Sequence, residues 1–226
     1  MKTLFNGSDP QLILFDLDGT LLDSVPDLAL AVDQMLSAVN RQPAGEARVR
    51  EWVGNGAQTL VKRALAGQQD YVESEVDDEL FEQAYQLFLS FYADCSAVGS
   101  VLYEGVKAFL DEVQERGIKL GLITNKPIHF TLPLLETFQL ADYFAIVLGG
   151  DSLSEKKPHP MPLIHAMQQL QHTPAQTLMI GDSRSDIRSA QAAGCAVAAV
   201  TYGYNHGEPV SRYQPDRVVD NLLELL

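Results

Sequence analysis

Short apolar segments alternate with amphipathic segments over the second half of the chain, and this alternation restricts the possible folds more than any other feature. Segments that are brief and mostly apolar on both faces are typical of strands buried on both sides. They predict strands at 12–15, 118–124, 144–148, 176–180 and 196–200. Apolar residues at helical spacing predict helices at 104–116, 133–139, 161–171, 185–193 and 221–226. Together they predict an α/β fold with a parallel sheet covered by helices.

The stretch between the first strand and residue 100 differs, because it shows helical spacing and no strand pattern. Four helices are predicted there, at 25–40, 46–53, 57–66 and 77–95. A helical segment inserted after the first strand predicts two domains. These are a sheet-based core of residues 1–23 and 100–226 and a helical insert of residues 24–99.

The 226-residue chain carries a net charge of −14, because 30 acidic residues outnumber 16 Lys and Arg. Such a charge repels nucleic acids and anionic membranes, so neither is expected as a partner. No apolar run approaches the roughly 20 residues that span a bilayer, and residues 1–10 lack a signal-peptide pattern. The two cysteines, Cys95 and Cys195, are better explained as free thiols than as a disulfide. These features predict a cytoplasmic protein, either a monomer or a homodimer.

Polar groups follow four of the predicted strands, at the edge where ligands bind in α/β sheets. Asp16 and Asp18 end the first strand, and the strand period places both carboxylates on one side. The other groups are Thr-Asn-Lys at 124–126, Lys-Lys-Pro at 156–158 and Gly-Asp-Ser-Arg-Ser-Asp at 181–186. Each group alone is as typical of a turn or a helix cap. Converging carboxylates require a cation, and a hydroxyl with a lysine suits a phosphate, so the set predicts a hard metal and a bound phosphate.

In this order, the groups around Asp16, Thr124, Lys157 and Asp182 resemble the four motifs of the haloacid dehalogenase (HAD) superfamily of phosphohydrolases. The resemblance extends over nearly the whole chain. It implies a Rossmann-like core with a parallel sheet. The helical insert resembles the four-helix, C1-type cap of the subgroup that closes over small substrates.

The resemblance implies a role for each carboxylate. Asp16 is expected to be the nucleophile that forms an aspartyl-phosphate, and Asp18 the general acid and base. The expected cofactor is Mg²⁺, held by Asp16, by the backbone carbonyl of Asp18 and by Asp182. Asp186 is expected to orient a metal-bound water or Lys157 without binding the metal itself.

The same resemblance assigns phosphate binding to the next two groups. The hydroxyl of Thr124 and the backbone N–H of Asn125 are expected to hold phosphate oxygens, and Lys157 to neutralise charge on the nucleophile and the phosphoryl group. Relatives that cleave carbon–halogen bonds lack a second aspartate in the first motif. Asp18 therefore favours hydrolysis of a phosphate ester over dehalogenation.

Two further stretches, 52–57 in the insert and 201–205 in the core, resemble the bacterial phosphoglycolate phosphatases of the superfamily. They favour a small phosphorylated metabolite as substrate, with 2-phosphoglycolate hydrolysed to glycolate and phosphate. One departure is Ser185, which stands where that group usually has asparagine before the last motif aspartate.

The leaving group has several candidate contacts. Free N–H groups of a loop that opens a helix can bind a carboxylate, and the same loop can merely join two helices. This loop consists of Gly54, Asn55 and Gly56. Arg184, Lys62 and Arg63 are candidate positive contacts, and their spacing does not select one of them.

Two other interpretations stay open. The first is another capped relative, such as a sugar phosphatase, a pyrophosphatase or a phosphosugar mutase, which a panel of substrates would separate. The second is a non-enzymatic phosphoacceptor similar to a signalling receiver domain, which also combines a parallel sheet with acidic residues, a threonine and a lysine. The helical insert and Asp18 argue against the receiver.

Overall fold

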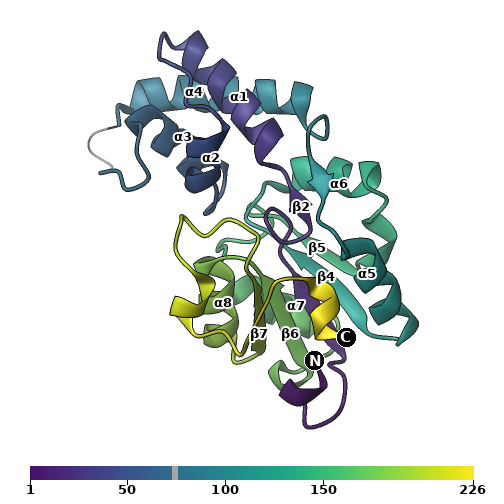
Figure 1. Cartoon of the computed structure of the whole chain (residues 1–226). Coiled ribbons are helices and arrows are strands. Elements are labelled where there is room, and N and C mark those ends of the chain that lie inside the picture. Colours follow the sequence, from purple (N-terminus) through teal and green to yellow (C-terminus); the bar gives the residue numbers. More distant parts are fainter. Residues whose placement is uncertain (73–75) are drawn as a thin grey trace.

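The computed structural model describes residues 1–72 and 76–226, which form a sheet-based core and a group of four helices beside it (Figure 1). The core contains a six-stranded sheet with the order β5-β4-β1-β6-β7-β8, and all its neighbouring strands are parallel, as predicted. Its strands are β1 Leu12–Phe15, β4 Lys119–Ile123, β5 Ile146–Leu148, β6 Thr177–Gly181, β7 Ala196–Val200 and β8 Arg217–Val219.

The central strand β1 is apolar on both faces because helices cover both sides of the sheet. Ile13 and Phe15 pack into a cluster with α5 (Val106–Glu115) on one face. Leu12 and Leu14 pack on the other face, in a cluster with α7 (Met161–Gln169) and α8 (Arg184–Ala193). The sheet is therefore covered on both sides, in agreement with the sequence pattern.

The four helices of the insert have a hydrophobic cluster of their own. They are α1 Val25–Ala38, α2 Glu46–Trp52, α3 Ala57–Ala66 and α4 Asp78–Cys95. An antiparallel pair of short strands, β2 (Leu22–Asp23) and β3 (Val101–Leu102), links them to the core. We propose this pair as the boundary between a core domain of residues 1–23 and 100–226 and a cap domain of residues 24–99. Positions 73–75 of the cap lie outside the described residues.

The helix after β4 begins earlier than predicted. Pro133 lies inside α6 (Ile128–Thr137), whereas the sequence pattern predicts it in the first turn of a helix at 133–139. The Ile128 backbone N–H donates a hydrogen bond of 2.8 Å to Asp151. A side chain distant in the sequence therefore accepts from one of the free N–H groups at the start of the helix. Strand β8 is not predicted from the sequence, because its three residues are too few for a periodic pattern.

In the described part of the chain, no helix combines the length and apolar character that a bilayer crossing requires. Both cysteines are buried free thiols, as predicted. Burial raises the pKa of Cys195 to about 12, so this side chain stays protonated and serves as part of the core.

Candidate active site

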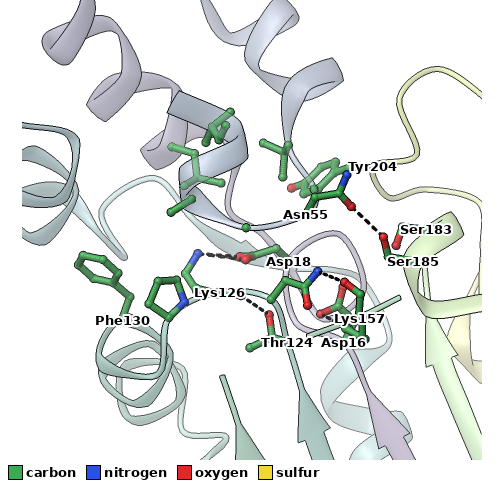
Figure 2. A pocket seen from close by; sticks show the side chains of 18 of the residues that line it. Asp16, Asp18, Asn55, Thr124, Lys126, Phe130, Lys157, Ser183, Ser185 and Tyr204 are labelled. Atoms are coloured by element: carbon green, nitrogen blue, oxygen red, sulfur yellow. Dashed lines mark hydrogen bonds and ion pairs between the residues drawn. The ribbon is translucent and has the colours of Figure 1, made fainter. Parts of the chain in front are cut away.

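The carboxyl ends of four neighbouring strands, β5, β4, β1 and β6, lead into loops that face the cap (Figure 2). A cavity of about 70 Å³ lies at this place. Its lining includes the expected site residues Asp16, Asp18, Gly54, Asn55, Gly56, Thr124, Asn125, Lys157, Asp182 and Asp186. The structure thus brings together all the residues selected from the sequence except the candidate cations of the leaving-group site.

Lys157 is buried between two carboxylates. Its Nζ lies 2.9 Å from Oδ1 of Asp16 and donates a hydrogen bond of 2.6 Å to Oδ1 of Asp186. Burial alone would lower the pKa of the lysine, but Asp16 and Asp186 raise it above its ordinary value. The ammonium therefore stays charged beside the expected nucleophile.

Asp186 is fully buried and paired through both oxygens. In addition to Lys157 at Oδ1, its Oδ2 accepts hydrogen bonds from the backbone N–H and the hydroxyl of Ser183, at 3.1 and 2.6 Å. Gly181 makes this position possible, because a Cβ there would lie 2.3 Å from Cγ of Asp186. This arrangement suits a residue that orients Lys157.

Asp182 is held against two glycines at the end of β6. Its Oδ1 accepts a hydrogen bond of 2.9 Å from the Thr20 hydroxyl, and its Oδ2 accepts one from the backbone N–H of Tyr204. A Cβ at Gly19 would lie 2.2 Å from Oδ2 of Asp182, and one at Gly203 would lie 2.3 Å from its Cβ. The side chain therefore has one position, which faces the cavity.

The residues around Asp16 fit a divalent cation. Asp16, Asp182 and Asp186 each offer an oxygen, and these oxygens lie within 4.8 Å of one another. Burial raises the pKa of Asp16 to about 7 although Lys157 opposes the rise, and burial together with the charges of Asp16 and Asp186 raises that of Asp182. The Lys157 ammonium pairs with Asp16 and Asp186, so one positive charge faces three carboxylates. A hard cation would offset this excess of buried negative charge.

Asp18 lies apart from this group and is paired with a different lysine (Figure 2). Its two oxygens are 3.0 and 3.1 Å from Nζ of Lys126, and Oδ1 also accepts a hydrogen bond from the hydroxyl of Ser24. The expected nucleophile Asp16 and the expected general acid Asp18 are therefore paired with different lysines, Lys157 and Lys126.

The loop after β4 supplies the expected phosphate contacts. Thr124 accepts a hydrogen bond of 3.1 Å from the backbone N–H of Lys126 through its side-chain oxygen. The side chain of Asn125 donates a hydrogen bond of 2.8 Å to the backbone carbonyl of Lys157. The first bond shapes the second motif loop, and the bond from Asn125 joins it to the third motif loop; residues of both loops line the cavity.

The cap reaches the core through the loop at 54–56. All three residues have positive φ angles, +125° for Gly54, +65° for Asn55 and +92° for Gly56. Glycine adopts such angles without steric cost, which explains its presence at positions 54 and 56. Ser185 donates a hydrogen bond of 2.8 Å to the side-chain oxygen of Asn55, and Lys156 donates one of 2.9 Å to the Asn55 carbonyl. Two contacts from the core thus anchor this cap loop.

The candidate cations Arg184, Lys62 and Arg63 do not belong to the described lining of the cavity. The backbone N–H of Arg184 donates to Asn205. Arg63 is buried in the cap, where its guanidinium donates to the backbone carbonyls of Trp52 and Gln69, at 2.6 and 3.0 Å. A third bond, of 3.4 Å, goes to the Gly54 carbonyl, so Arg63 stabilises the cap and the backbone of its cavity loop.

A family model described as haloacid dehalogenase-like hydrolase matches residues 13–200. This chain belongs to the haloacid dehalogenase-like hydrolases. A phosphoglycolate phosphatase from Pseudomonas putida KT2440 is 50% identical over 225 residues, which cover 100% of this hydrolase and 82% of the relative. A phosphoglycolate phosphatase from Nitrosococcus oceani is 46% identical, with 96% of this chain and 95% of the relative covered.

The fold of the hydrolase also matches a crystal structure described as a predicted phosphoglycolate phosphatase from Haemophilus somnus 129PT. The two share 37% identity with a TM-score of 0.87, over 96% of this chain and 97% of the other. The Rossmann-like core and helical cap expected from the sequence are thus confirmed, and the hydrolase is an enzyme of the phosphatase type.

Several polar side chains in this hydrolase's cavity belong to the sequence motifs, although the sequence alone predicts no individual role for them. Lys126, Tyr204 and Ser185 all line it, and Ser24 contacts Asp18 from its edge. Lys126 was visible next to Thr124, and Tyr204 within the stretch 201–205. Their partners depend on how loops fold, which no local pattern in the sequence reports.

Proposed function

We propose that this hydrolase converts 2-phosphoglycolate to glycolate and phosphate, with Mg²⁺ as cofactor and an aspartyl-phosphate on Asp16 as intermediate. One observation carries the proposal: Asp16 lines a small cavity and lies 2.9 Å from a buried lysine ammonium. Relatives at 46–50% identity are named phosphoglycolate phosphatases, which supports the choice of substrate.

In the first step, a carboxylate oxygen of Asp16 attacks phosphorus, and the bond between phosphorus and the ester oxygen breaks. Lys157 offsets the charge on the phosphoryl group. Asp18 donates a proton to the ester oxygen, so that glycolate leaves with a hydroxyl group.

In the second step, Asp18 takes a proton from a water molecule whose oxygen attacks phosphorus. The bond between phosphorus and Asp16 breaks, phosphate leaves and the Asp16 carboxylate is restored. The proton stays on Asp18 and is available for the next leaving group, so the cycle is balanced.

The remaining residues hold the reacting groups in place. Thr124 and the backbone N–H of Asn125 bind phosphate oxygens, while Asp186 keeps Lys157 beside Asp16. Asp16, Asp182 and the backbone carbonyl of Asp18 would hold Mg²⁺, which would supply positive charge for the phosphoryl oxygens.

The size of the cavity favours a small leaving group. Its volume is about 70 Å³, and the cap side chains of Leu28, Leu60 and Phe88 form part of its wall. A leaving group of a few atoms suits this space better than a sugar.

The test is steady-state kinetics on a panel of phosphate esters with Mg²⁺. We expect kcat/KM for 2-phosphoglycolate to exceed the values for glucose 6-phosphate, ribose 5-phosphate and pyrophosphate by at least about 100-fold. A sugar phosphate or pyrophosphate turned over faster than 2-phosphoglycolate would overturn the substrate assignment. One phosphate bound per chain without continuous release would instead indicate a phosphoacceptor.

A further inference from the structure

Two buried polar side chains of the cavity have no role in the proposed reaction. Lys126 comes from the core loop after β4, Tyr92 from α4 of the cap, and both line the cavity. They are 6% and 1% exposed. The Lys126 ammonium lies 4.8 Å from the centre of the Tyr92 ring, so cap and core meet at this point.

Lys126 and Lys157 are the two cations among the described lining residues, and their surroundings differ. Lys157 is enclosed by two carboxylates, whereas Asp18 is the one carboxylate paired with Lys126 among the residues described. An ammonium offers three donors, so the Asp18 side chain does not saturate Lys126. Figure 2 shows this lysine directed toward Asp18, with Phe130 on its other side.

The Tyr92 hydroxyl is buried and interacts with the Lys126 ammonium, but none of the described residues accepts a hydrogen bond from it. A buried hydroxyl whose proton has no acceptor costs free energy, so its presence at a cavity points to an acceptor that a ligand supplies. Burial raises the pKa of Tyr92 to about 12, which keeps the hydroxyl a donor at neutral pH. Apolar side chains of Leu28, Phe88 and Phe130 line the same cavity and keep a donated hydrogen bond out of water.

The position of Asp18 relates these donors to the substrate. Asp18 protonates the ester oxygen in the proposed reaction, so it contacts the leaving group at that atom. Lys126 lies 3.0 Å from Asp18 and is therefore one contact away from the ester oxygen. In 2-phosphoglycolate a single carbon separates the ester oxygen from the carboxylate, which brings the carboxylate to the Lys126 ammonium.

We propose that Lys126 and the Tyr92 hydroxyl form the binding site for the carboxylate of the leaving group. The enzyme would then select phosphate esters that carry an anion one carbon away from the ester oxygen. This inference rests on the proposed phosphatase function and adds the two residues that determine its specificity.

The experiment compares 2-phosphoglycolate with 2-hydroxyethyl phosphate, an ester of similar size in which a neutral hydroxymethyl group replaces the carboxylate. For each protein the readout is the ratio of the two kcat/KM values. We expect Lys126→Gln to lower this ratio by about 10- to 100-fold, the loss typical of a hydrogen bond to a charged group, mainly through KM for 2-phosphoglycolate. Tyr92→Phe removes only the hydroxyl and should lower the ratio by about 3- to 10-fold.

Lys107→Gln is the control, because it removes the same charge from an exposed core lysine that contacts Gln139 and does not belong to the described lining of the cavity. Its ratio should equal that of the wild type. If Lys126→Gln slows both esters by the same factor, Lys126 only positions Asp18 and the subsite is refuted. If Lys107→Gln lowers the ratio as much as Lys126→Gln, general electrostatics explains the preference and the subsite is also refuted.

Failure of the subsite differs from failure of the proposed function. A wild-type enzyme that hydrolyses neither ester contradicts the function itself. A wild-type enzyme that hydrolyses both equally well contradicts the substrate assignment and the subsite together. Thermal unfolding of each variant establishes that it is folded, and Tyr92→Phe keeps the test decisive even if Lys126→Gln unfolds.

Discussion

The two buried lysines of the active site lie in opposite electrostatic surroundings. On the Lys157 side, the carboxylates of Asp16, Asp182 and Asp186 lie together, and one ammonium pairs with two of them, Asp16 and Asp186. On the Lys126 side, one ammonium faces the single carboxylate of Asp18 and the ring of an aromatic residue.

This difference indicates two tasks. An excess of buried negative charge on the Lys157 side calls for a cation, which is what a phosphoryl-transfer site requires. On the Lys126 side the ammonium pairs with the single carboxylate of Asp18, so an N–H group of the ammonium is available to an anionic leaving group. A net charge of −14 is therefore compatible with an anionic substrate, because the local charges decide binding.

The largest expected effect comes from Asp16→Asn, which removes the nucleophile and keeps its size. Turnover of 2-phosphoglycolate should fall by at least about 10⁴-fold. Steady-state kinetics measures the loss, and circular dichroism establishes that the fold is retained. Substantial activity in a folded Asp16→Asn protein would contradict the assigned role.

Exchange of the two lysines for glutamine tests the comparison directly. Lys157→Gln leaves Asp16 and Asp186 without their cation, so we expect kcat for the acidic and the neutral ester to fall alike, by about 1,000-fold. Removing one partner of a buried ion pair should also lower the free energy of unfolding by about 3 kcal/mol. If Lys157→Gln changed the ratio of the two esters instead, the division of tasks between the lysines would be wrong.

The charge excess on the Lys157 side predicts how stability depends on pH without metal. Burial raises the pKa of Asp16 in the folded protein to about 7, from an ordinary value of 3.8. Between pH 3.8 and about pH 7, the Asp16 carboxyl group is ionised in the unfolded chain and still protonated in the folded protein. The free energy of unfolding should therefore decrease as pH rises from about 4 to 7, by an amount on the order of 4 kcal/mol.

Urea unfolding in EDTA at several pH values measures this decrease, with Asp16→Asn as the control that lacks the carboxyl group. Saturating Mg²⁺ favours the ionised carboxylates and should abolish the decrease, and it should restore the activity that EDTA removes. An equal pH dependence in the wild type and in Asp16→Asn would show that Asp16 does not titrate in this range.

The smallest effect should come from Ser185→Ala, which removes one of the two bonds that anchor the cap loop at Asn55. Loss of about 1 kcal/mol predicts a KM for 2-phosphoglycolate about 5-fold higher. Ser37→Ala is the control, since the exposed Ser37 hydroxyl bonds only its own helix, at the Asp33 carbonyl. Unchanged KM in Ser185→Ala would mean that this bond does not position the loop.

Much of this site could be predicted because it depends on local patterns. Strand ends place Asp16 and Asp182 at one edge of the sheet, and helix α3 spans the residues expected from its apolar spacing. The contacts that could not be predicted join distant segments. Asp18 meets Lys126 over 108 positions of sequence, and Asp151 caps a helix that begins at Ile128. Local periodicity contains no information about such pairs.

The place of β1 in the sheet has a consequence for the order of folding. Its two neighbours are β4 and β6, so Leu12 pairs with Lys119 and with Thr177. The strand that ends at Asp16 therefore pairs with partners more than 100 residues away, whereas contacts among cap helices such as α1, α2 and α3 join segments much nearer in the chain. During synthesis the cap can form first, and the site is completed only after Asp182 and Asp186, which follow β6, have emerged from the ribosome.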